Sequence, residues 1–487
     1  KAHPSGHPYC SPFECWLPAP SHTAENDGGD HMQVLLRNLR RRPPVGCRHG
    51  SVHGAVRSCC YSGGGSTGAP RGTAVLSFGD NSMGALGLPF PLRDAYEPTR
   101  VPSLPSPGAI TSLAAGHYHS LAVTSSGEVW AWGRNDEGQL GRGHPTPRDT
   151  WHEPRKVEGL DHVKIRSAFA SGVVSAALGD DGSLWVWGKS KRGQLGLGNG
   201  IAEAIKPSKV ESLEGEEIVK VSLGWGHVLA QTSDGKLFGW GYSEDGRMGR
   251  LGQNLDTTSV LPPSSDPSRM SRNNISPMEV VEKLISEKME KEKNMPIIWE
   301  PAAIRELDGV KVSDVACGLD HSLVLCGDGT VLSCGNNTYG QLGRTSEGCK
   351  MLPVEMPFLP VSLSAGLGHS LVLCRVLSEE ITNEATRIIS WGWNQSSQLG
   401  RQGDGDRPGV IEGLAGQKPL SVSGGRVHSI AVTTEGEAWV WGSGRNGRLG
   451  LGSSADEPEP ALLECLDGLE VLQAVCGFDH NLLLVAE

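Results

Sequence analysis

The sequence lacks features that several classes of protein require. No run of 18 or more apolar residues occurs among its 487 residues, so no membrane-spanning helix is expected. Its 12 cysteines include no C-x-x-C pair, which disfavours a zinc site or disulfide framework and favours small buried thiols. No nucleophile elbow, Walker loop or dinucleotide-binding fingerprint stands in the context that its chemistry requires. We therefore predict no catalytic residues, no metal site and no cofactor.

One segment of the chain has no acidic residues, and its charge is therefore opposite in sign to that of the rest. Residues 32–72 contain seven arginines and no Asp, Glu or Lys. The whole chain has a net charge of -11; because residues 1–31 contribute -3 and residues 32–72 contribute +7, residues 73–487 contribute -15. An acidic body repels phosphate backbones, so nonspecific nucleic-acid binding is disfavoured.

The arginine-rich segment has the composition of an organellar transit peptide. It starts "MQVLLRNLRRR" at Met32, and Val34, Leu35 and Leu39 can form the apolar side of a short helix that ends at Pro43. We expect residues 1–31 to be a non-native or disordered leader and residues 32–72 to direct import. The predicted location is mitochondrial. A plastid is the alternative organelle, and a nuclear or cytosolic location is disfavoured. The other interpretation of the segment is a disordered basic tail that carries no targeting signal.

Two short motifs recur along the rest of the chain. G-x-x-H-S followed by an apolar run starts at Gly116, Gly318, Gly366 and Gly425. W-G-x-N-x-x-G-Q-L-G, with variations, ends at Gly141, Gly196, Gly249, Gly343, Gly400 and Gly450. The distance from the start of the first motif to the end of the second is 25 residues in five of six units, and 34 in the unit that carries "SEEITNEATR". Such regular spacing indicates a repeated structural unit.

The two ends of the repeat complement each other. "LSFGDNSMGALG", which ends at Gly87, is a second motif without a first, and "GFDHNLLLVAE", which begins at Gly477, is a first motif without a second. Within the units, Asp-Gly or Ser-Gly joins two apolar runs, as hairpins require. We predict an all-β fold over residues 73–487: a seven-bladed β-propeller of four-stranded antiparallel blades, closed by the N- and C-terminal strands.

The motifs, at roughly 50–55 residues per unit, resemble the regulator of chromosome condensation repeat family over residues 75–487, and the basic leader adds a similarity to its plant mitochondrial members. The resemblance implies three groups of relatives: exchange factors for the Ran GTPase, the plant ultraviolet-B photoreceptor, and protein-binding platforms. The photoreceptor is the least favoured, because its repeated G-W-R-H-T appears here only as "GWGH" around Trp225.

The repeated His and Trp residues are predicted to be structural. A catalytic histidine is needed once, whereas these recur in most units, so we expect hydrogen bonds within each blade and buried indoles. Cys334 takes the place of Trp in one unit. The residues are His119, His227, His321, His369, His428 and His480, with Trp132, Trp187, Trp240, Trp391 and Trp441.

The resemblance also implies a partner-binding rim. In the family, the two residues between Gly and His emerge on one face of the propeller. Aromatic and arginine side chains at these positions have the composition of an interface core; ordinary loop residues are the alternative. The predicted rim residues are His117, Tyr118, Trp225, Leu319, Asp320, Leu367, Arg426, Phe478 and Asp479.

One link between units is much longer than the others. Residues 253–297 contain "SPMEVVEKLISEKMEKEKN", in which Ser276, Pro277 and Glu279 form an N-cap signature for a short helix. The narrow apolar stripe of this helix could dock on the propeller or grip a partner; a tolerated surface insertion is the alternative.

The sequence is compatible with two functions. The first is a non-catalytic protein-interaction platform in an organelle, the mitochondrion by prediction, that supports transcript processing or respiratory complex assembly. The alternative is guanine-nucleotide exchange on a small GTPase, for which Asp320 and Asp479 would be the available rim acids. Both functions need a protein partner on one propeller face.

Overall fold

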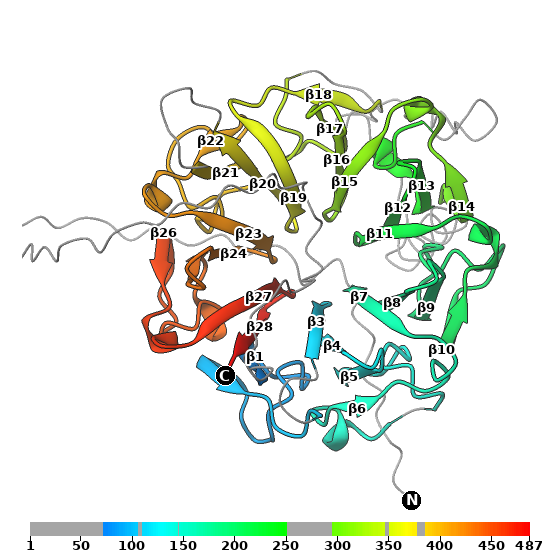
Figure 1. Ribbon diagram of the computed structural model, residues 1–487, viewed down its shortest axis with the longest axis horizontal. Coiled ribbons are helices and arrows are strands. Elements are labelled where there is room, and N and C mark those ends of the chain that lie inside the picture. Colours follow the sequence, from blue (N-terminus) through cyan, green and yellow to red (C-terminus); the bar gives the residue numbers. More distant parts are fainter. Residues whose placement is uncertain (1–71, 106–109, 145, 251–294, 346–349, 377–384) are drawn as a thin grey trace, which may run out of the picture. The chain divides into compact units, whose positions relative to one another are not determined.

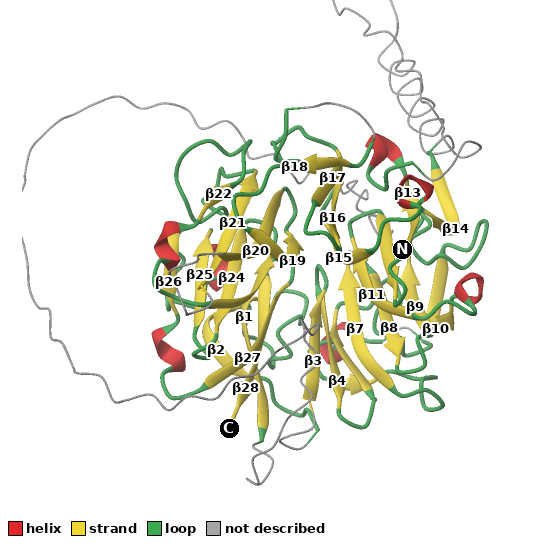
Figure 2. Cartoon of the chain, turned by 45° about the horizontal axis from the view of Figure 1, so that its top comes forward, coloured by secondary structure: helices red, strands yellow, loops and turns green. Residues whose placement is uncertain are grey.

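A computed structural model describes residues 72–105, 110–144, 146–250, 295–345, 350–376 and 385–487. All of them belong to one compact unit, Thr67–Glu487. Seven four-stranded antiparallel sheets surround a central axis (Figure 1), so the prediction of a seven-bladed propeller is confirmed. Among the described residues, the helical segments are short 3-10 turns beside the strands (Figure 2).

Six blades are continuous in sequence and run from an inner strand to an outer strand. Blade 1 has β3 (Ile110–Ala115), β4 (His119–Thr124), β5 (Val129–Gly133) and β6 (Arg155–Lys156). Blade 2 has β7 (Ile165–Ser171), β8 (Val174–Gly179), β9 (Leu184–Lys189) and β10 (Glu203–Lys209). Blade 3 has β11 (Ile218–Leu223), β12 (His227–Thr232), β13 (Leu237–Tyr242) and β14 (Ile297–Ala303).

The next three blades follow the same order. Blade 4 has β15 (Val312–Cys317), β16 (His321–Cys326), β17 (Val331–Gly335) and β18 (Leu352–Val354). Blade 5 has β19 (Leu359–Ala365), β20 (His369–Val376), β21 (Ala385–Gly392) and β22 (Gly409–Val410). Blade 6 has β23 (Pro419–Gly424), β24 (His428–Thr433), β25 (Ala438–Gly442) and β26 (Glu457–Leu462). The described 3-10 turns are η1 (Arg148–Thr150), η2 (Glu211–Leu213), η3 (Glu244–Gly246), η5 (Arg305–Leu307), η6 (Glu412–Leu414), η7 (Arg445–Gly447) and η8 (Glu464–Leu466).

Blade 7 joins the two ends of the repeat. It combines β27 (Glu470–Cys476) and β28 (His480–Ala486) with β1 (Thr73–Asp80) and β2 (Asp94–Arg100). β1 pairs with β28 from Thr73 opposite Ala486 to Gly79 opposite His480. Closure by both terminal strands, as predicted, leaves no blade incomplete. The helix predicted within 253–297 lies outside the described residues; only residues 295–297 of that segment are described, and Ile297 begins β14.

The second strand of each blade is buried on both faces. β4, β8, β12 and β16 have every residue buried. Each sheet is covered by a neighbouring sheet on either side, and a strand inside such a stack needs apolar side chains on both faces. This explains why "HSLAVT" and its repeats show continuous apolar runs instead of the alternation of a half-exposed strand.

The repeated histidines connect neighbouring blades. His119 Nε2 lies 2.8 Å from Ser175 Oγ of blade 2, and Ser175 Oγ donates to the Gln139 carbonyl of blade 1 at 2.8 Å. Because the hydroxyl proton goes to the carbonyl, the imidazole must donate from Nε2. The expectation of hydrogen bonds within each blade is therefore wrong: the bond crosses to the next blade. The other five pairs, at 2.8 to 3.1 Å, are His227–Ser322, His321–Ser370, His369–Ser429, His428–Asn481 and His480–Ser120.

The histidines are neutral in the folded protein. Each of the six is at most 1% exposed. Burial lowers the pKa of His119, His321 and His369 to about 3 and that of His480 to about 4. Burial also holds the pKa of His227 and His428 well below the ordinary 6.5.

Four of the five repeated tryptophans donate to the same carbonyl as the serine of their blade; Trp240 is the exception, because its blade has Val228 at the serine position. All five indoles are 0% exposed. Their Nε1 atoms donate at 2.8 to 2.9 Å to the loop of the preceding blade; Trp187, for example, donates to the Gln139 carbonyl. Where Cys334 replaces Trp, Met351, which precedes β18, packs into the same cluster and lies beside Gly249, whereas the equivalent glycines of most other blades lie beside an indole.

Blade 2 departs from the pattern at three linked positions. Elsewhere a Cβ on the first glycine of G-x-x-H would overlap the imidazole of the same turn. Blade 2 has Val174 in place of His, and Ser171 then takes the place of that glycine. Its neighbour has Val228 where the other blades accept the imidazole proton, and Val174 and Val228 share one apolar cluster. The loss of the imidazole thus removes both the need for glycine and the need for a hydroxyl.

One buried arginine has fewer partners than its counterparts in other blades. Arg142 is 4% exposed, and among the described residues its Nε and Nη1 atoms have no hydrogen-bond acceptor. In blade 4 the equivalent Arg344 donates from Nε to Ser333 Oγ at 3.0 Å. The residue at the serine position of blade 1 is Ala131, whose carbonyl accepts from Arg142 Nη2 at 3.0 Å but whose side chain has no acceptor for Nε.

We expect Ala131→Ser to stabilise the propeller. The new hydroxyl would accept from Arg142, and a satisfied buried hydrogen bond contributes about 1 kcal/mol to the free energy of unfolding. Urea denaturation measures the change. Ala122→Ser is the control. Both alanines are fully buried in apolar clusters, but only position 131 corresponds to the serine that accepts from an arginine in blade 4, so the hydroxyl at position 122 should destabilise. Equal effects of the two substitutions would contradict the role assigned to Arg142.

Candidate functional site at the channel mouth

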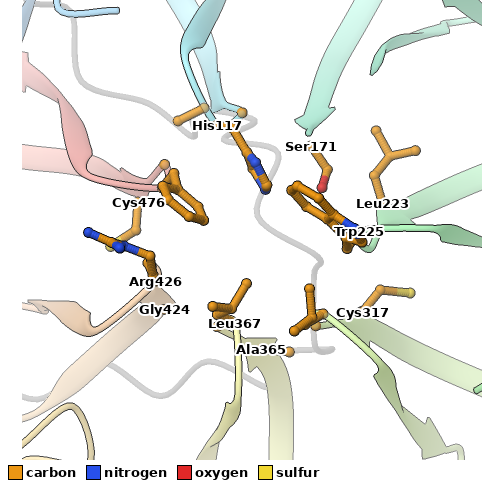
Figure 3. Close-up of a pocket in the computed structure, with 18 of the residues that line it drawn as sticks. His117, Ser171, Leu223, Trp225, Cys317, Ala365, Leu367, Gly424, Arg426 and Cys476 are labelled. Atoms are coloured by element: carbon orange, nitrogen blue, oxygen red, sulfur yellow. The ribbon is translucent and has the colours of Figure 1, made fainter. Parts of the chain in front are cut away.

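The predicted rim converges on the central channel. A cavity of about 110 Å³ opens at the axis. Its walls carry the first residue after the repeated glycine in six blades, namely His117, Trp225, Leu319, Leu367, Arg426 and Phe478. Figure 3 shows the side chains of His117, Trp225 and Leu367 around this opening. We call the face that bears these turns the channel-mouth face.

An aromatic stack crosses the mouth between blades that are not neighbours. The His117 ring of blade 1 lies 4.5 Å from the Trp225 ring of blade 3, with an interplanar angle of 25°. It also lies 4.5 Å from the Phe478 ring of blade 7. Blade 2, between blades 1 and 3, has Gly172 at this position, so no side chain separates His117 from Trp225. Burial beside other basic groups lowers the pKa of His117 to about 3, so this ring is neutral near pH 7.

Arginines pack on the aromatic rings and neutralise one of the predicted acids. The Arg426 guanidinium lies 4.7 Å from the Phe478 ring centroid. It also pairs with Asp479 at 2.7 Å, and the buried Arg448 pairs with the same carboxylate at 3.0 Å. Phe478 is 6% exposed and Asp479 is 8% exposed, so both lie beneath the surface of the mouth. Tyr118 is half-buried, with its ring 5.8 Å from Phe478.

The other predicted acid is paired as well. Asp320 lies 2.5 Å from Arg247, a fully buried arginine of the preceding blade. Its carboxylate is 32% exposed, and it therefore reaches the surface as part of an ion pair. Leu319 and Leu367 are half-buried and line the channel. Of the predicted rim residues, the ones that present accessible aromatic surface are His117, Tyr118 and Trp225.

Two thiols line the channel below the aromatic residues. Cys317 and Cys476 end the inner strands of blades 4 and 7. Burial raises the pKa of each thiol to about 12. A thiol that stays protonated near pH 7 is a poor nucleophile, so a packing role fits these two cysteines better than a reactive one.

Sequence reasoning missed a second set of variable positions on the same face. The strands of a blade alternate in direction, so the loop after the third strand emerges on the face that bears the G-x-x-H turn. This loop holds the variable residues inside W-G-x-N-x-x-G. Tyr339 and Trp393 stack there at 5.3 Å, and Tyr339 is 44% exposed. Arg192 lies on such a loop, and Tyr242 is the last residue before one. The sequence contained the information needed to find them, because the residues at these positions differ between repeats just as the rim residues do.

The parts of the chain that the structure describes contain no group of three or more His, Cys, Asp or Glu side chains that could hold a metal ion. Within the same residues, no helix has the length and apolar character needed to cross a membrane. The site therefore consists of an open, aromatic and arginine-rich surface on a rigid β scaffold.

A ring of seven blades with these motifs defines a class of propeller, and comparison with known families places the chain within it. The protein belongs to the RCC1-like domain family, which matches residues 74–483. The family resemblance drawn from the repeated motifs is thereby confirmed. The similarity to plant mitochondrial members stays a prediction.

Individual relatives share the propeller at moderate identity. The ultraviolet-B receptor UVR8 of Arabidopsis thaliana is 29% identical over 402 residues, 81% of this chain and 78% of the relative. The E3 ubiquitin-protein ligase HERC2 of Homo sapiens is 30% identical over 76% of this chain, which spans only 7% of that relative. The secretion-regulating guanine nucleotide exchange factor of Bos taurus is 32% identical over 62% of this chain and 61% of the relative.

Solved structures agree on the fold. Prp20p of Saccharomyces cerevisiae, studied for its binding to Gsp1p and histones, has a TM-score of 0.67 and 23% identity over 86% of this chain and 92% of its own. Human WBSCR16 has a TM-score of 0.66 and 22% identity over 86% of this chain and 100% of its own. Identities this low support the architecture alone.

Proposed function

We propose that the protein is a non-catalytic interaction platform that binds a protein partner on its channel-mouth face. The observation that carries the proposal is the cluster at the mouth, where accessible His117, Tyr118 and Trp225 are held by contacts between blades. Rigid aromatic side chains beside arginines are the usual energetic centres of protein interfaces. Their preorganisation by the ring lowers the entropy lost on binding.

Trp225→Ala should abolish partner capture while the propeller stays folded. Truncating an interface tryptophan costs about 2 kcal/mol or more of binding free energy, which corresponds to roughly 30-fold weaker binding. The measurement is affinity capture from an organellar extract with the tagged chain, followed by mass spectrometry. Trp299→Ala is the matched control, because Trp299 is half-buried on the outer strand β14 of the same blade.

Partners retained by Trp225→Ala but lost with Trp299→Ala would place the interface on the side of the propeller. If both variants retain the partners, the next candidate for the interface is the stack of Tyr339 and Trp393. Thermal melts of both variants show whether any loss of capture is a loss of fold.

Guanine-nucleotide exchange on a small GTPase is the second candidate, and the bovine relative named as an exchange factor favours it. Against it, the carboxylates of Asp320 and Asp479 are already paired with arginines and are not free to approach a nucleotide site. Release of fluorescent GDP from a panel of small GTPases tests it. Acceleration at catalytic amounts of the chain would establish exchange activity, and no acceleration with a GTPase that it captures would support a platform.

We also propose a mitochondrial site of action, in transcript processing or respiratory complex assembly. The support is the acid-free composition of residues 32–72, which lie outside the described residues. A fluorescent reporter fused to residues 32–72 should enter mitochondria. A plastid signal would correct the organelle, and a diffuse cytosolic or nuclear signal would overturn the proposal.

A further inference from the structure

Arg192 differs from the other arginines of the channel-mouth face. Its guanidinium lies 5.4 Å from the Trp225 ring centroid and 5.9 Å from that of Tyr242. Across the described residues, no carboxylate comes within ion-pair distance of Arg192, and its guanidinium donates no hydrogen bond. The adjacent Lys191 is exposed and has no ion pair in the same residues either. By contrast, Arg134, Arg247 and Arg426 are each paired with a carboxylate.

Blade 2 also leaves a notch in the rim. At the position where six blades project a side chain, blade 2 has Gly172, and a Cβ built there would meet nothing within 4 Å. The notch belongs to the same blade as Lys191 and Arg192, and it adjoins the turn of Trp225, because Ser171 Oγ donates to the Gly224 carbonyl at 3.0 Å. The blade therefore combines an open position next to the turn of Trp225 with an arginine on the Trp225 ring that has no ion-pair partner among the described residues.

A half-buried cation without a counter-ion is an unfavourable arrangement. Burial lowers the pKa of Arg192, and the nearby Arg247 lowers it further. The opposing attraction of Asp320 is the smallest of the three effects, and Asp320 is already paired with Arg247. The faces of the Trp225 and Tyr242 rings supply a weak cation–π attraction. A carboxylate would supply charge-assisted hydrogen bonds in the planar geometry that guanidinium favours.

We propose that the partner of the channel-mouth face inserts an acidic side chain, Asp or Glu, into the notch at Gly172, where it pairs with Arg192. The inference rests on the proposed function and specifies the chemistry of the partner. The aromatic stack contacts the apolar atoms that flank the acid, and Lys191 adds long-range attraction. The partner is thus a protein segment with an acidic residue between apolar neighbours.

Short fluorescein-labelled peptides test the proposal by fluorescence anisotropy. The probe has a central Glu flanked by Leu and Gly, and two matched probes carry Gln or Lys instead. The Glu probe should bind at least ~10-fold more tightly than the Gln probe, as expected for a charged hydrogen-bonded pair. Arg192→Gln should remove the difference, and Arg192→Glu should reverse the preference toward the Lys probe.

A second variant tests the notch itself. Gly172 has φ of +54°, a conformation that Asn tolerates, so Gly172→Asn should fill the notch without unfolding the blade. We expect it to weaken the Glu probe about as much as Arg192→Gln does. Thermal melts confirm that each variant remains folded.

The outcomes separate this inference from the function on which it rests. Equal affinity for the Glu and Gln probes, or no binding of any probe, would overturn the proposal that the partner inserts an acidic side chain. If charge makes no difference but Trp225→Ala abolishes binding, the mouth binds peptides and only the acidic specificity fails. If Glu preference persists at full strength in Trp225→Ala, Arg192 recognises acids while the aromatic stack is not the interface.

Discussion

Acidification from about pH 7.5 to about pH 5.5 should lower the melting temperature of the propeller by roughly 5–10 °C. Six histidines stay neutral in the fold, because burial lowers the pKa of His119, His321 and His369 to about 3 and that of His480 to about 4, and holds the pKa of His227 and His428 well below 6.5. In the unfolded chain the same groups titrate near 6.5. The unfolded state therefore takes up protons as the pH falls below 6.5, whereas the folded state does not.

The sign follows from this difference in proton binding. The contribution of each histidine is complete above its unfolded pKa and is lost progressively as the pH falls from about 6.5 toward its folded pKa. One pH unit below 6.5, each contributes a loss of about 1 kcal/mol, so six together remove several kcal/mol. Paired carboxylates do not produce this loss, because their unfolded pKa values lie near 4 and their contribution declines only at lower pH.

Differential scanning calorimetry across this pH range measures the effect. The double variant His321→Val/Ser370→Val copies the valine pair of blades 2 and 3. It should take up about one proton fewer on unfolding at acidic pH, so its stability should decline less steeply as the pH falls. A melting temperature that does not change between the two pH values would contradict neutral, buried imidazoles. A decline that begins only below pH 4.5 would assign the loss to carboxylates.

Gly318→Ala should be among the most destabilising single substitutions in the chain, with a loss of about 3 kcal/mol or more. The added Cβ would overlap Cε1 of His321 and would lie 2.8 Å from the Gly366 carbonyl oxygen. Neither neighbour can move freely: the imidazole is fully buried between blades, and the carbonyl belongs to the backbone of the next turn. Urea denaturation gives the change in the free energy of unfolding.

Ser171→Ala is the matched control for this substitution. It changes the same position of the turn in blade 2, where a Cβ is already present because Val174 replaces the imidazole. It should cost far less, since only the 3.0 Å bond from Ser171 Oγ to the Gly224 carbonyl is lost. Equal losses of unfolding free energy in Gly318→Ala and Ser171→Ala would show that the imidazole is not the reason why this position must be glycine.

A rescue variant strengthens the argument. Gly318→Ser combined with His321→Val and Ser370→Val transfers the three linked residues of the blade 2 junction to the blade 4 junction. It should recover most of the stability lost in Gly318→Ala, because the imidazole and the hydroxyl that it needs are removed together. No recovery would mean that the junctions of blades 2 and 4 differ in more than these positions.

The sequence by itself determined the architecture of this protein. The spacing of the two motifs sets the number of blades, and the incomplete ends at Gly87 and Gly477 predict closure by both termini. These features are local, since each motif carries its own turn, its own apolar strands and the glycine that its histidine requires. The recurrence of His and Trp also indicated burial, because a side chain repeated in most blades serves the shared fold.

Only the tertiary structure decided how the repeats meet. The histidine bonds cross to the next blade, and Asp320 and Asp479 are paired with arginines from other loops. His117 reaches Trp225 because Gly172 leaves an empty position between them. These contacts depend on the ring, which brings residues far apart in sequence to one axis. Side-chain length at each position around that axis then determines which residues touch, and no single repeat contains that information.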